Sequence, residues 1–274
     1  MKAGIIGGTG RMGRLFVRVF ERAGYEVMVS GRKTTVTSAD IARQCDLVIV
    51  SVPIHDTVKV IGEIAPLLRP GQLLCDFTSL KVEPVKAMLE SKADVIGLHP
   101  MFGPTVRSIS RQTIILCPAR AGKERVAALV ALFEAQGAVC TIATPEEHDR
   151  IVAVVQGLTH FVTLCMADTV RRLGVDIRTT QAFTSPVYQI ELSLMGRLLS
   201  QDPALYADIL EGNPFVPEVL AACRNSAAEL SAIIEAKDAE GFRKFFEQNS
   251  RNLGSYCEEG QKTTDALIEC MVNQ

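Results

Sequence analysis

A glycine pattern at the start of the chain constrains its fold more than any other feature. Gly8, Gly10 and Gly13 form a G-x-G-x-x-G pattern, which follows a short apolar run, AGIIG, and opens a run of helical periodicity. The apolar residues of that periodic run are Met12, Leu15, Phe16, Val19 and Phe20. Glycines in a strand-to-helix turn let backbone N–H groups approach a pyrophosphate at the helix N-terminus. The pattern predicts a dinucleotide-binding domain of the Rossmann type, with Thr9, Arg11 and Met12 beside the cofactor; a turn of the same shape without a ligand is the alternative.

Strand and helix patterns alternate through residues 1–143. Apolar runs that we expect as strands are AGIIG, YEVMVS, DLVIVSV, QLLCDFT, ADVIGLHP, TIILCP and AVCTIA. Helices are expected over GRMGRLFVRVFERAG, over HDTVKVIGEIAPLL, and around residues 83–91 and 122–136. Such alternation implies a parallel sheet whose strands are joined by right-handed crossover helices.

The strand pattern stops near residue 145. Pro145, Glu146 and Glu147 suit the first turn of a helix, because proline fits its first position and acids favour its positive end. Further helical segments are expected at 179–200, 203–211, 215–236 and 238–270. We therefore predict an α/β chain with a dinucleotide-binding domain over residues 1–144. An all-α substrate-binding and dimerisation domain follows over residues 145–274.

Composition argues against several classes of partner. The 274 residues include 29 Lys+Arg and 31 Asp+Glu, for a net charge of −2, so no basic excess is available for a nucleic-acid backbone. No apolar run approaches the roughly 20 residues of a membrane helix, and the N-terminus shows no signal-peptide pattern. The 8 cysteines form no C-x-x-C pair, and no ligand spacing joins them to the 4 histidines. We expect a cytoplasmic protein with reduced thiols, and no metal, nucleic-acid or membrane partner.

The end of the second expected strand bears on the choice of cofactor. An NAD site usually has Asp or Glu there, which accepts a hydrogen bond from the ribose 2′-hydroxyl. This chain has Ser30, Arg32 and Lys33 there and no acid. A hydroxyl and two cations suit the 2′-phosphate of NADP, so we predict NADP. NAD is the alternative if Arg32 and Lys33 only form a solvated turn.

Candidate catalytic groups gather where expected strands end. His99 lies in GLHPMFGP at the end of one strand, and Ser79 and Lys81 lie in DFTSLK at the end of another. Ligands of open α/β sheets bind at the carboxyl ends of the strands, where a histidine can accept a proton from a substrate hydroxyl. In the helical half, His160 and Arg197 are further candidates. Taken singly, each group has a structural alternative: a strand-end hydrogen bonder, a packed helix histidine or a surface charge.

Together these residues resemble a known family. The chain is similar to the TyrA family of prephenate and arogenate dehydrogenases, above all to the dehydrogenase half of the bifunctional chorismate mutase/prephenate dehydrogenase. Matching stretches are GGTGRMGRLF, VIVSVPIHDT, DFTSLK, GLHPMFGP, EEHDR, GLTHF, SPVYQIELSLMGRL and QDPALYADI. The resemblance fades beyond residue 213, and we expect neither a mutase segment nor a regulatory domain.

The resemblance implies an enzyme of tyrosine biosynthesis. Such enzymes oxidise the C4 carbinol of prephenate with NAD(P), release the ring carboxylate as CO₂ and form 4-hydroxyphenylpyruvate. His99 matches the catalytic histidine, which hydrogen-bonds the C4 hydroxyl, and Ser79 matches a serine near that hydroxyl and the nicotinamide. Val52 and Pro53 match residues of the cofactor site. The helical domain of the family forms a homodimer.

The resemblance also implies a set of substrate-binding residues. His160 matches a second site histidine, Arg197 an arginine that grips a substrate carboxylate, and Tyr206 an aromatic residue of the pocket. Lys81 matches a lysine that either attracts an anion or makes a structural contact at the strand end. We expect structural roles for two further matched histidines: His55 at a helix start, and His148 at an exposed first-turn position.

One position departs from the family pattern. Gln189, in SPVYQIEL, is expected in the substrate-binding site and stands where relatives of this kind usually have arginine. Arogenate and 4-amino-4-deoxyprephenate carry an amino group and less net negative charge than prephenate, so either could make a second cation dispensable. Prephenate is the predicted substrate, and these two are the alternatives.

Two alternative assignments, to other groups of proteins, stay open. Dehydrogenases of the 6-phosphogluconate or 3-hydroxyisobutyrate type share the expected architecture. They should carry a catalytic lysine on the interdomain helix, whereas this chain has no lysine between Lys123 and Lys237. A non-catalytic NADP-binding sensor would keep the glycines, but it need not keep His99, Ser79 and Arg197 together.

Overall fold

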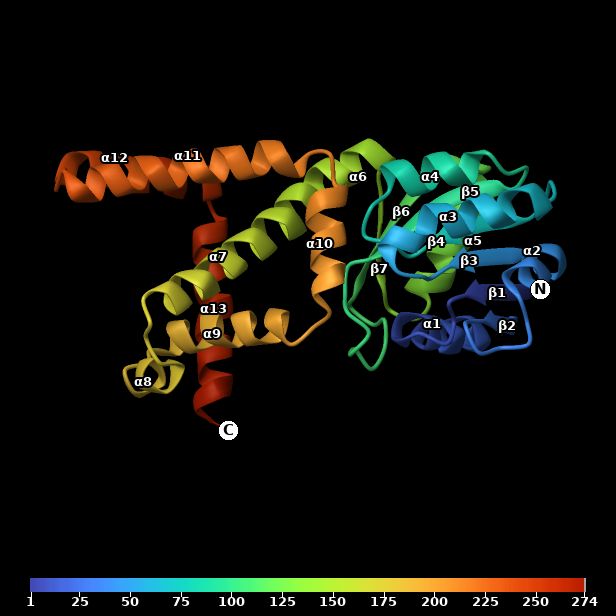
Figure 1. The fold of residues 1–274 in the computed structure, drawn as a ribbon, viewed down its shortest axis with the longest axis horizontal. Coiled ribbons are helices and arrows are strands. Elements are labelled where there is room, and N and C mark those ends of the chain that lie inside the picture. Colours follow the sequence, from blue (N-terminus) through green and yellow to red (C-terminus); the bar gives the residue numbers. More distant parts are fainter. Residues whose placement is uncertain (274) are drawn as a thin grey trace. The chain divides into compact units, whose positions relative to one another are not determined.

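A computed structural model describes residues 1–273 of the chain (Figure 1). By their internal contacts these residues form two compact units. The first, here called the sheet unit, comprises Met1–Ala153 and Ala204–Phe215. The second, the helical unit, comprises Val154–Pro203 and the described chain from Val216 onward.

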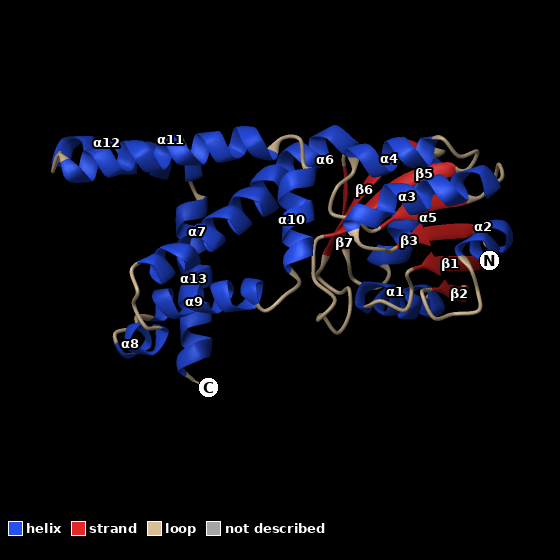
Figure 2. Ribbon diagram, viewed as in Figure 1, coloured by secondary structure: helices blue, strands red, loops and turns tan. Residues whose placement is uncertain are grey.

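The sheet unit is built on seven strands, which confirm the seven expected from the sequence (Figure 2). Their bounds are β1 Lys2–Ile6, β2 Glu26–Ser30, β3 Leu47–Val50, β4 Leu73–Asp76, β5 Asp94–Pro100, β6 Thr113–Arg120 and β7 Val139–Ile142. The spatial order is β2-β1-β3-β4-β5-β6-β7. Because the order reverses at β1, loops diverge beyond the carboxyl ends of β1 and β3, and ligands of such sheets bind at that point.

The sheet is not parallel throughout. Strands β1 to β5 pair in parallel, β6 pairs antiparallel with β5, and β7 pairs parallel with β6. The parallel sheet expected from the sequence is therefore corrected at its far edge. The cause lies in the connection over residues 101–112, which contains no helix. A parallel return to the same sheet requires a crossover that is usually helical, whereas an antiparallel return does not.

Helices cover both faces of the sheet. Helices α1 (Arg11–Arg22) and α5 (Lys123–Glu134) pack on one face, and α2 (Ser38–Gln44), α3 (Ile54–Ile64) and α4 (Val82–Leu89) on the other. A 3₁₀ turn, Ala65–Leu67, follows α3. Neighbouring residues of β3 enter opposite cores, Ile49 with α1 and Val50 with α3, as the two-residue period of a strand requires. At the centre of the sheet both faces are buried, so β1, β3 and β4 are nearly continuous apolar runs.

Helix α2 was not expected from the sequence. Its start is a capping box, in which the Thr37 side chain accepts from the backbone N–H of Asp40, while the Asp40 carboxylate accepts from the N–H of Thr37. A Thr-x-x-Asp pattern is the local signal of such a start. The helix has only seven residues, too few for a clear helical periodicity.

Two further helices belong to the sheet unit. Helix α6 (Pro145–Val152) starts as expected, with Pro145 in its first turn and Thr144 and Glu147 forming a capping box. Helix α10 (Pro203–Gly212) lies almost wholly within the segment that returns to this unit. Internal contacts therefore continue the sheet unit through α6 to Ala153 and add α10 to it. The domain division at residue 144 stays a prediction.

The helical unit contains the remaining helices. They are α7 Thr159–Arg172, α8 Ile177–Ala182, α9 Pro186–Leu199, α11 Val216–Glu235, α12 Ala239–Leu253 and α13 Tyr256–Val272. A π-helical segment, Ala153–Leu158, separates α6 from α7. The helix expected over 238–270 is divided at Gly254, whose φ of +57° favours glycine.

One stretch of the described chain, Pro145–Arg172, is long and apolar enough to cross a membrane by length and composition. The expectation that no apolar run approaches this length is therefore wrong for this stretch. Only 17% of its most apolar window is buried. A single helix of this kind is weak support for a membrane span, because a helix that packs against protein meets the same criteria.

Candidate active site

A cavity of about 710 Å³ lies at the point where the strand order reverses. Three chain segments supply most of its lining residues, each at the carboxyl end of a strand: Ile6, Gly7, Thr9 and Gly10 at β1, Ser30–Arg32 at β2, and Ser51–Pro53 at β3. Helix α1 begins beside it, with Gly10 as its N-cap and no acidic residue in its first turn. A helix N-terminus of this kind attracts the anionic pyrophosphate of a dinucleotide.

The glycines of the turn are required by close backbone contacts. A Cβ atom on Gly7 would lie 2.2 Å from the carbonyl oxygen of Ser51, and the φ of Gly7 is +82°. A Cβ atom on Gly13 would lie 2.5 Å from Cα of Gly8. The turn therefore admits no side chain at these positions. Gly7, which the sequence pattern omitted, is the residue with the positive φ.

A buried polar atom in the cavity wall also fits a dinucleotide. The Ser30 side chain is 2% exposed, and its Oγ has no hydrogen-bond partner among the described residues. A buried hydroxyl without a hydrogen-bond partner destabilises the folded protein unless a ligand or a water molecule bonds to it. Ser30 lies at the end of β2, where the adenosine ribose binds in this class of fold.

The predicted cofactor residues divide into two groups. Those that line the cavity are Thr9, Gly10, Ser30, Arg32, Val52 and Pro53. Those outside its wall are Gly8, Arg11, Met12, Gly13 and Lys33. Within the second group, Gly8 and Gly13 shape the turn and Met12 packs on the core, whereas Arg11 and Lys33 are exposed.

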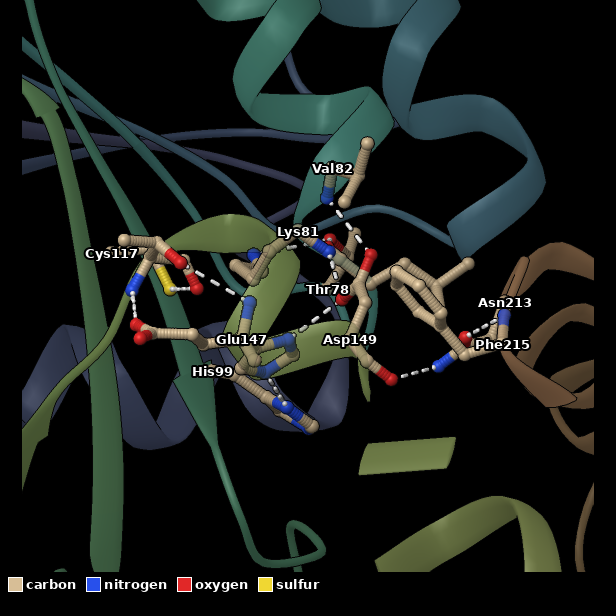
Figure 3. Close-up of polar contacts among 12 residues, drawn as sticks. Thr78, Lys81, Val82, His99, Cys117, Glu147, Asp149, Asn213 and Phe215 are labelled. Atoms are coloured by element: carbon tan, nitrogen blue, oxygen red, sulfur yellow. Dashed lines mark hydrogen bonds and ion pairs between the residues drawn. The ribbon is translucent and has the colours of Figure 1, made fainter. Parts of the chain in front are cut away.

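His99 lies near the carboxyl end of β5 and is 2% exposed. Its Nδ1 is 2.8 Å from Nε2 of His148, and Nδ1 of His148 is 2.7 Å from Oδ1 of Asp149. Figure 3 shows His99 and Asp149 within this group of polar contacts. The expectation of an exposed His148 is wrong: the residue lies on the buried side of α6, which packs against β6 and α4.

Asp149 is tied to the start of α4 and to the segment after α10 (Figure 3). Its carboxylate accepts from the backbone N–H groups of Lys81 and Val82, at 2.8 and 2.9 Å. Its backbone carbonyl accepts from Nδ2 of Asn213 at 2.8 Å. A carboxylate in this position satisfies amide groups of the first helical turn and complements the helix dipole.

The protonation of the two rings follows from their burial. Burial, followed by the neighbouring His148 and Lys81, holds the pKa of His99 well below its ordinary value. Burial also lowers the pKa of His148, although the hydrogen bond to Asp149 acts in the opposite direction. His99 is therefore neutral near pH 7 and can accept a proton.

Lys81 makes the strand-end contact that the sequence left as one of two alternatives. Its side chain is fully buried, and Nζ forms an ion pair with Asp76. Nζ also donates to the backbone carbonyl of Leu98 at 2.9 Å, directly before His99. These contacts agree with the structural alternative for Lys81, whereas its substrate-binding role stays a prediction.

Two more predicted residues lie in the sheet unit. Ser79 is half-buried in the loop between β4 and α4. Tyr206 is half-buried on α10, which was expected to belong to the helical domain. Within this unit, α10 contacts α3 through Asp208, whose Oδ2 is 2.8 Å from Nδ1 of His55. His55 lies in the first turn of α3, as expected, and also lines the cavity.

The other predicted substrate residues lie in the helical unit. His160 is half-buried on α7, and burial lowers its pKa. Gln189 and Arg197 are exposed on α9. The structure thus groups His99, Ser79 and Tyr206 in one unit and these three residues in the other. That all six surround one substrate stays a prediction.

His148, Asp149 and Asn213 were missed as parts of the site. The sequence contained one signal for them, a histidine and an acid side by side in EEHDR just after the last strand. Their contact with His99 depends on how α6 packs against the sheet, which the local pattern does not specify. Asn213, which donates to the backbone carbonyl of Asp149, lies 64 residues further along the chain.

Two family models match the chain in succession. Residues 25–142 match the model described as the nucleotide-binding domain of prephenate dehydrogenase, and residues 144–248 match the model described as its dimerization domain. The chain belongs to the prephenate dehydrogenase family. This confirms the resemblance to the TyrA family and makes the protein a member of a family of NAD(P)-dependent oxidoreductases.

Curated relatives of the prephenate dehydrogenase family cover nearly the whole chain. It is 37% identical to the probable arogenate/prephenate dehydrogenase of Methanocaldococcus jannaschii, over 98% of this chain and 65% of that protein. It is 33% identical to the T-protein of Haemophilus influenzae, over 97% and 70%. It is 26% identical to the 4-amino-4-deoxyprephenate dehydrogenase of Streptomyces pristinaespiralis, over 92% and 91%. The chain therefore spans about two thirds of the length of the first two.

Solved structures of the family share the fold. Synechocystis arogenate dehydrogenase superimposes with a TM-score of 0.75 at 18% identity, covering 93% of this chain and 100% of that chain. Prephenate dehydrogenase from Aquifex aeolicus, in complex with hydroxyphenyl propionate and NAD⁺, gives a TM-score of 0.73 at 21% identity, covering 92% and 98%. At these identities the likeness establishes the fold, a Rossmann-type domain followed by a helical region.

Proposed function

We propose that this chain catalyses the NAD(P)-dependent oxidative decarboxylation of prephenate to 4-hydroxyphenylpyruvate, a step of tyrosine biosynthesis in the cytoplasm. The observation that carries the proposal is a buried imidazole, His99, at the carboxyl end of β5 in the unit that holds the cofactor cavity. A base in this position is what an alcohol oxidation requires. The names of the relatives support the substrate class.

In this proposal each residue acts on a stated part of the reaction. NAD(P), when bound by the glycine turn and the Ser30 hydroxyl, supplies the hydride acceptor. Nε2 of His99 takes the proton of the C4 hydroxyl, and Ser79 orients that hydroxyl. Arg197 holds a substrate carboxylate through its planar guanidinium, with His160 and Tyr206 completing the substrate pocket. Loss of CO₂ then yields the aromatic ring.

Gln189 favours a second candidate substrate class. Arogenate and 4-amino-4-deoxyprephenate need one cation fewer than prephenate, and one relative is named as a 4-amino-4-deoxyprephenate dehydrogenase. Purified protein should be assayed with prephenate, arogenate and 4-amino-4-deoxyprephenate side by side, by nicotinamide absorbance. The highest kcat/KM should be with prephenate. Bound nucleotide without turnover of any of the three would contradict the proposal and favour the sensor.

We propose NADP as the preferred cofactor. Arg32 lines the cavity beside the end of β2, and the only acid among the lining residues, Asp56, lies on α3 rather than at that strand end. Arg32→Glu should raise the Kd for NADP by roughly 10-fold or more, and the Kd for NAD much less. Lys33→Glu, outside the cavity wall, is the matched control and should change the ratio of the two Kd values less. Equal weakening of both cofactors by Arg32→Glu would contradict NADP preference.

We also propose that the chain forms a homodimer through its helical unit. The family model over residues 144–248 is described as a dimerization domain. This unit leaves large apolar side chains exposed, among them Phe183, Leu199 and Phe246. Light scattering after gel filtration should give twice the 29.8 kDa of one chain. A mass of one chain across the accessible concentrations would contradict the proposal.

A further inference from the structure

His99 is the first member of a hydrogen-bonded chain of three buried side chains, His99, His148 and Asp149. Beyond the proposed function, on which this inference rests, we infer that His148 and Asp149 are positioning residues: they hold His99 in the tautomer whose Nε2 is unprotonated. In the proposed reaction, that nitrogen is the one that accepts the proton of the substrate hydroxyl.

The donors and acceptors of the three side chains can be assigned by starting from Asp149. The Asp149 carboxylate already accepts from two backbone N–H groups, and its Oδ1 is 2.7 Å from Nδ1 of His148. A carboxylate only accepts, so Nδ1 of His148 carries the proton. In neutral His148, Nε2 is then an acceptor, and it lies 2.8 Å from Nδ1 of His99, which must donate. The other nitrogen of His99, Nε2, then carries no proton.

Asp149, at the end of this hydrogen-bonded series, is held in place by contacts that do not involve His99. The carboxylate of Asp149 is bound to the first turn of α4, and its backbone carbonyl is bound to Asn213. The side chains of His148 and Asp149 are 0% and 2% exposed, so water does not compete for these bonds. A fixed acceptor of this kind sets both the tautomer and the orientation of the imidazole that it contacts.

The surrounding charges are compatible with this assignment. Besides Asp149, the charged groups that act on the two rings are the buried ammonium of Lys81, on the loop before α4, and the Asp76 carboxylate at the end of β4, which pair with each other. No proton needs to move along the chain of side chains during the reaction. The hydroxyl proton ends on Nε2 of His99, the C4 hydride passes to the nicotinamide, and the ring carboxylate leaves as CO₂.

Variants of the full chain at His148 separate positioning from packing. In His148→Gln, the amide oxygen can reach the place of Nε2 and accept from His99. In His148→Leu, a side chain of similar bulk accepts nothing. Thr144→Ala is the matched control, because it removes the cap of α6 without touching the three side chains and should lower Tm alone.

We expect His148→Leu to lower kcat by roughly 10²-fold with KM changed less than about 3-fold, the scale of a displaced acid–base group. His148→Gln should recover most of that loss, and Thr144→Ala should keep kcat within about 2-fold of the parent. A folded His148→Leu that keeps the parent kcat would overturn the inference. Equal losses of kcat in folded His148→Leu and His148→Gln would also overturn it, because a hydrogen-bond acceptor at this position would then make no difference to catalysis.

Nitrogen-15 spectra of histidine-labelled protein test the tautomer without turnover, and only four histidines need assignment. In the parent and in His148→Gln, His99 should carry its proton on Nδ1. A proton on Nε2 of the neutral parent ring would overturn the inference even if His148→Leu fails to fold. If the parent turns over none of the three substrates, the proposed function fails, whereas the spectra still decide the role of His148 and Asp149.

Discussion

The two units of the molecule bury their side chains to very different extents. In the sheet unit, α1 alone contributes five buried residues, and large side chains such as Phe16, Phe20 and Phe133 are fully buried. In the helical unit, α7, α8, α12 and α13 contribute none. The sheet unit therefore has a core of its own, whereas the helical unit leaves apolar surface of the kind that the proposed homodimer would cover. The residues of the predicted site differ in the same way: His99, in the sheet unit, is buried, whereas Arg197, in the helical unit, is exposed.

The largest expected effect is on kcat, from replacement of the buried residue His99. His99→Asn removes the proton acceptor of the reaction and should lower kcat by roughly 10²–10⁴-fold, the range for a lost acid–base group. The measurement is steady-state turnover with prephenate. Cofactor affinity, followed by nicotinamide fluorescence, should change little, because the cavity wall does not include His99. A variant with parental kcat would remove His99 from the mechanism.

A matched pair of phenylalanines tests the difference in burial. Phe133→Ala in the sheet unit should lower the free energy of unfolding by about 3–5 kcal/mol, because the parent ring is fully buried. Phe246→Ala in the helical unit, where the ring is 65% exposed, should cost less than about 1 kcal/mol. Urea denaturation measures both. A loss at Phe246 as large as that at Phe133, and dependent on protein concentration, would instead show that a partner copy buries Phe246.

The same division explains what the sequence could predict. The strands and the glycine turn are local patterns, and all seven strands are present. The antiparallel β6 and the π-helical segment were not predicted, because each depends on how a segment packs rather than on its periodicity. His99 was found from a motif, whereas its contact with His148 joins residues 49 positions apart. Buried polar contacts of that kind arise from packing between distant segments, and no local pattern encodes them.

Arg197 tests the exposed half of the predicted site. Its guanidinium should bind a substrate carboxylate, and charge-assisted hydrogen bonds of this kind contribute about 1.5–3 kcal/mol. Arg197→Ala should therefore raise KM for prephenate by roughly 10- to 100-fold, with a smaller change in kcat. Arg178→Ala is a suitable control, since Arg178 is also an exposed arginine of the helical unit and has no proposed role. An unaltered KM for Arg197→Ala would contradict the carboxylate-binding role.

The smallest expected effect is the pH dependence of stability. Burial lowers the pKa of His99 and His148 in the folded protein, while both titrate near 6.5 when unfolded. Below about pH 6.5 the unfolded state therefore binds more protons, so these two residues favour unfolding increasingly as the pH falls, and they have no such effect above that pH. Urea denaturation at about pH 7.5 and pH 5.5 measures the slope.

Carboxylates also titrate in this range, so the slope must be compared between variants. The double replacement His99→Asn, His148→Gln should flatten the pH dependence, because the two buried rings no longer take up protons on unfolding. His160→Gln should flatten it less, since His160 is only half-buried in the helical unit. If His160→Gln has the larger effect, the titrating groups that matter lie in the helical unit. The assignment of the buried polar chemistry to the sheet unit would then be wrong.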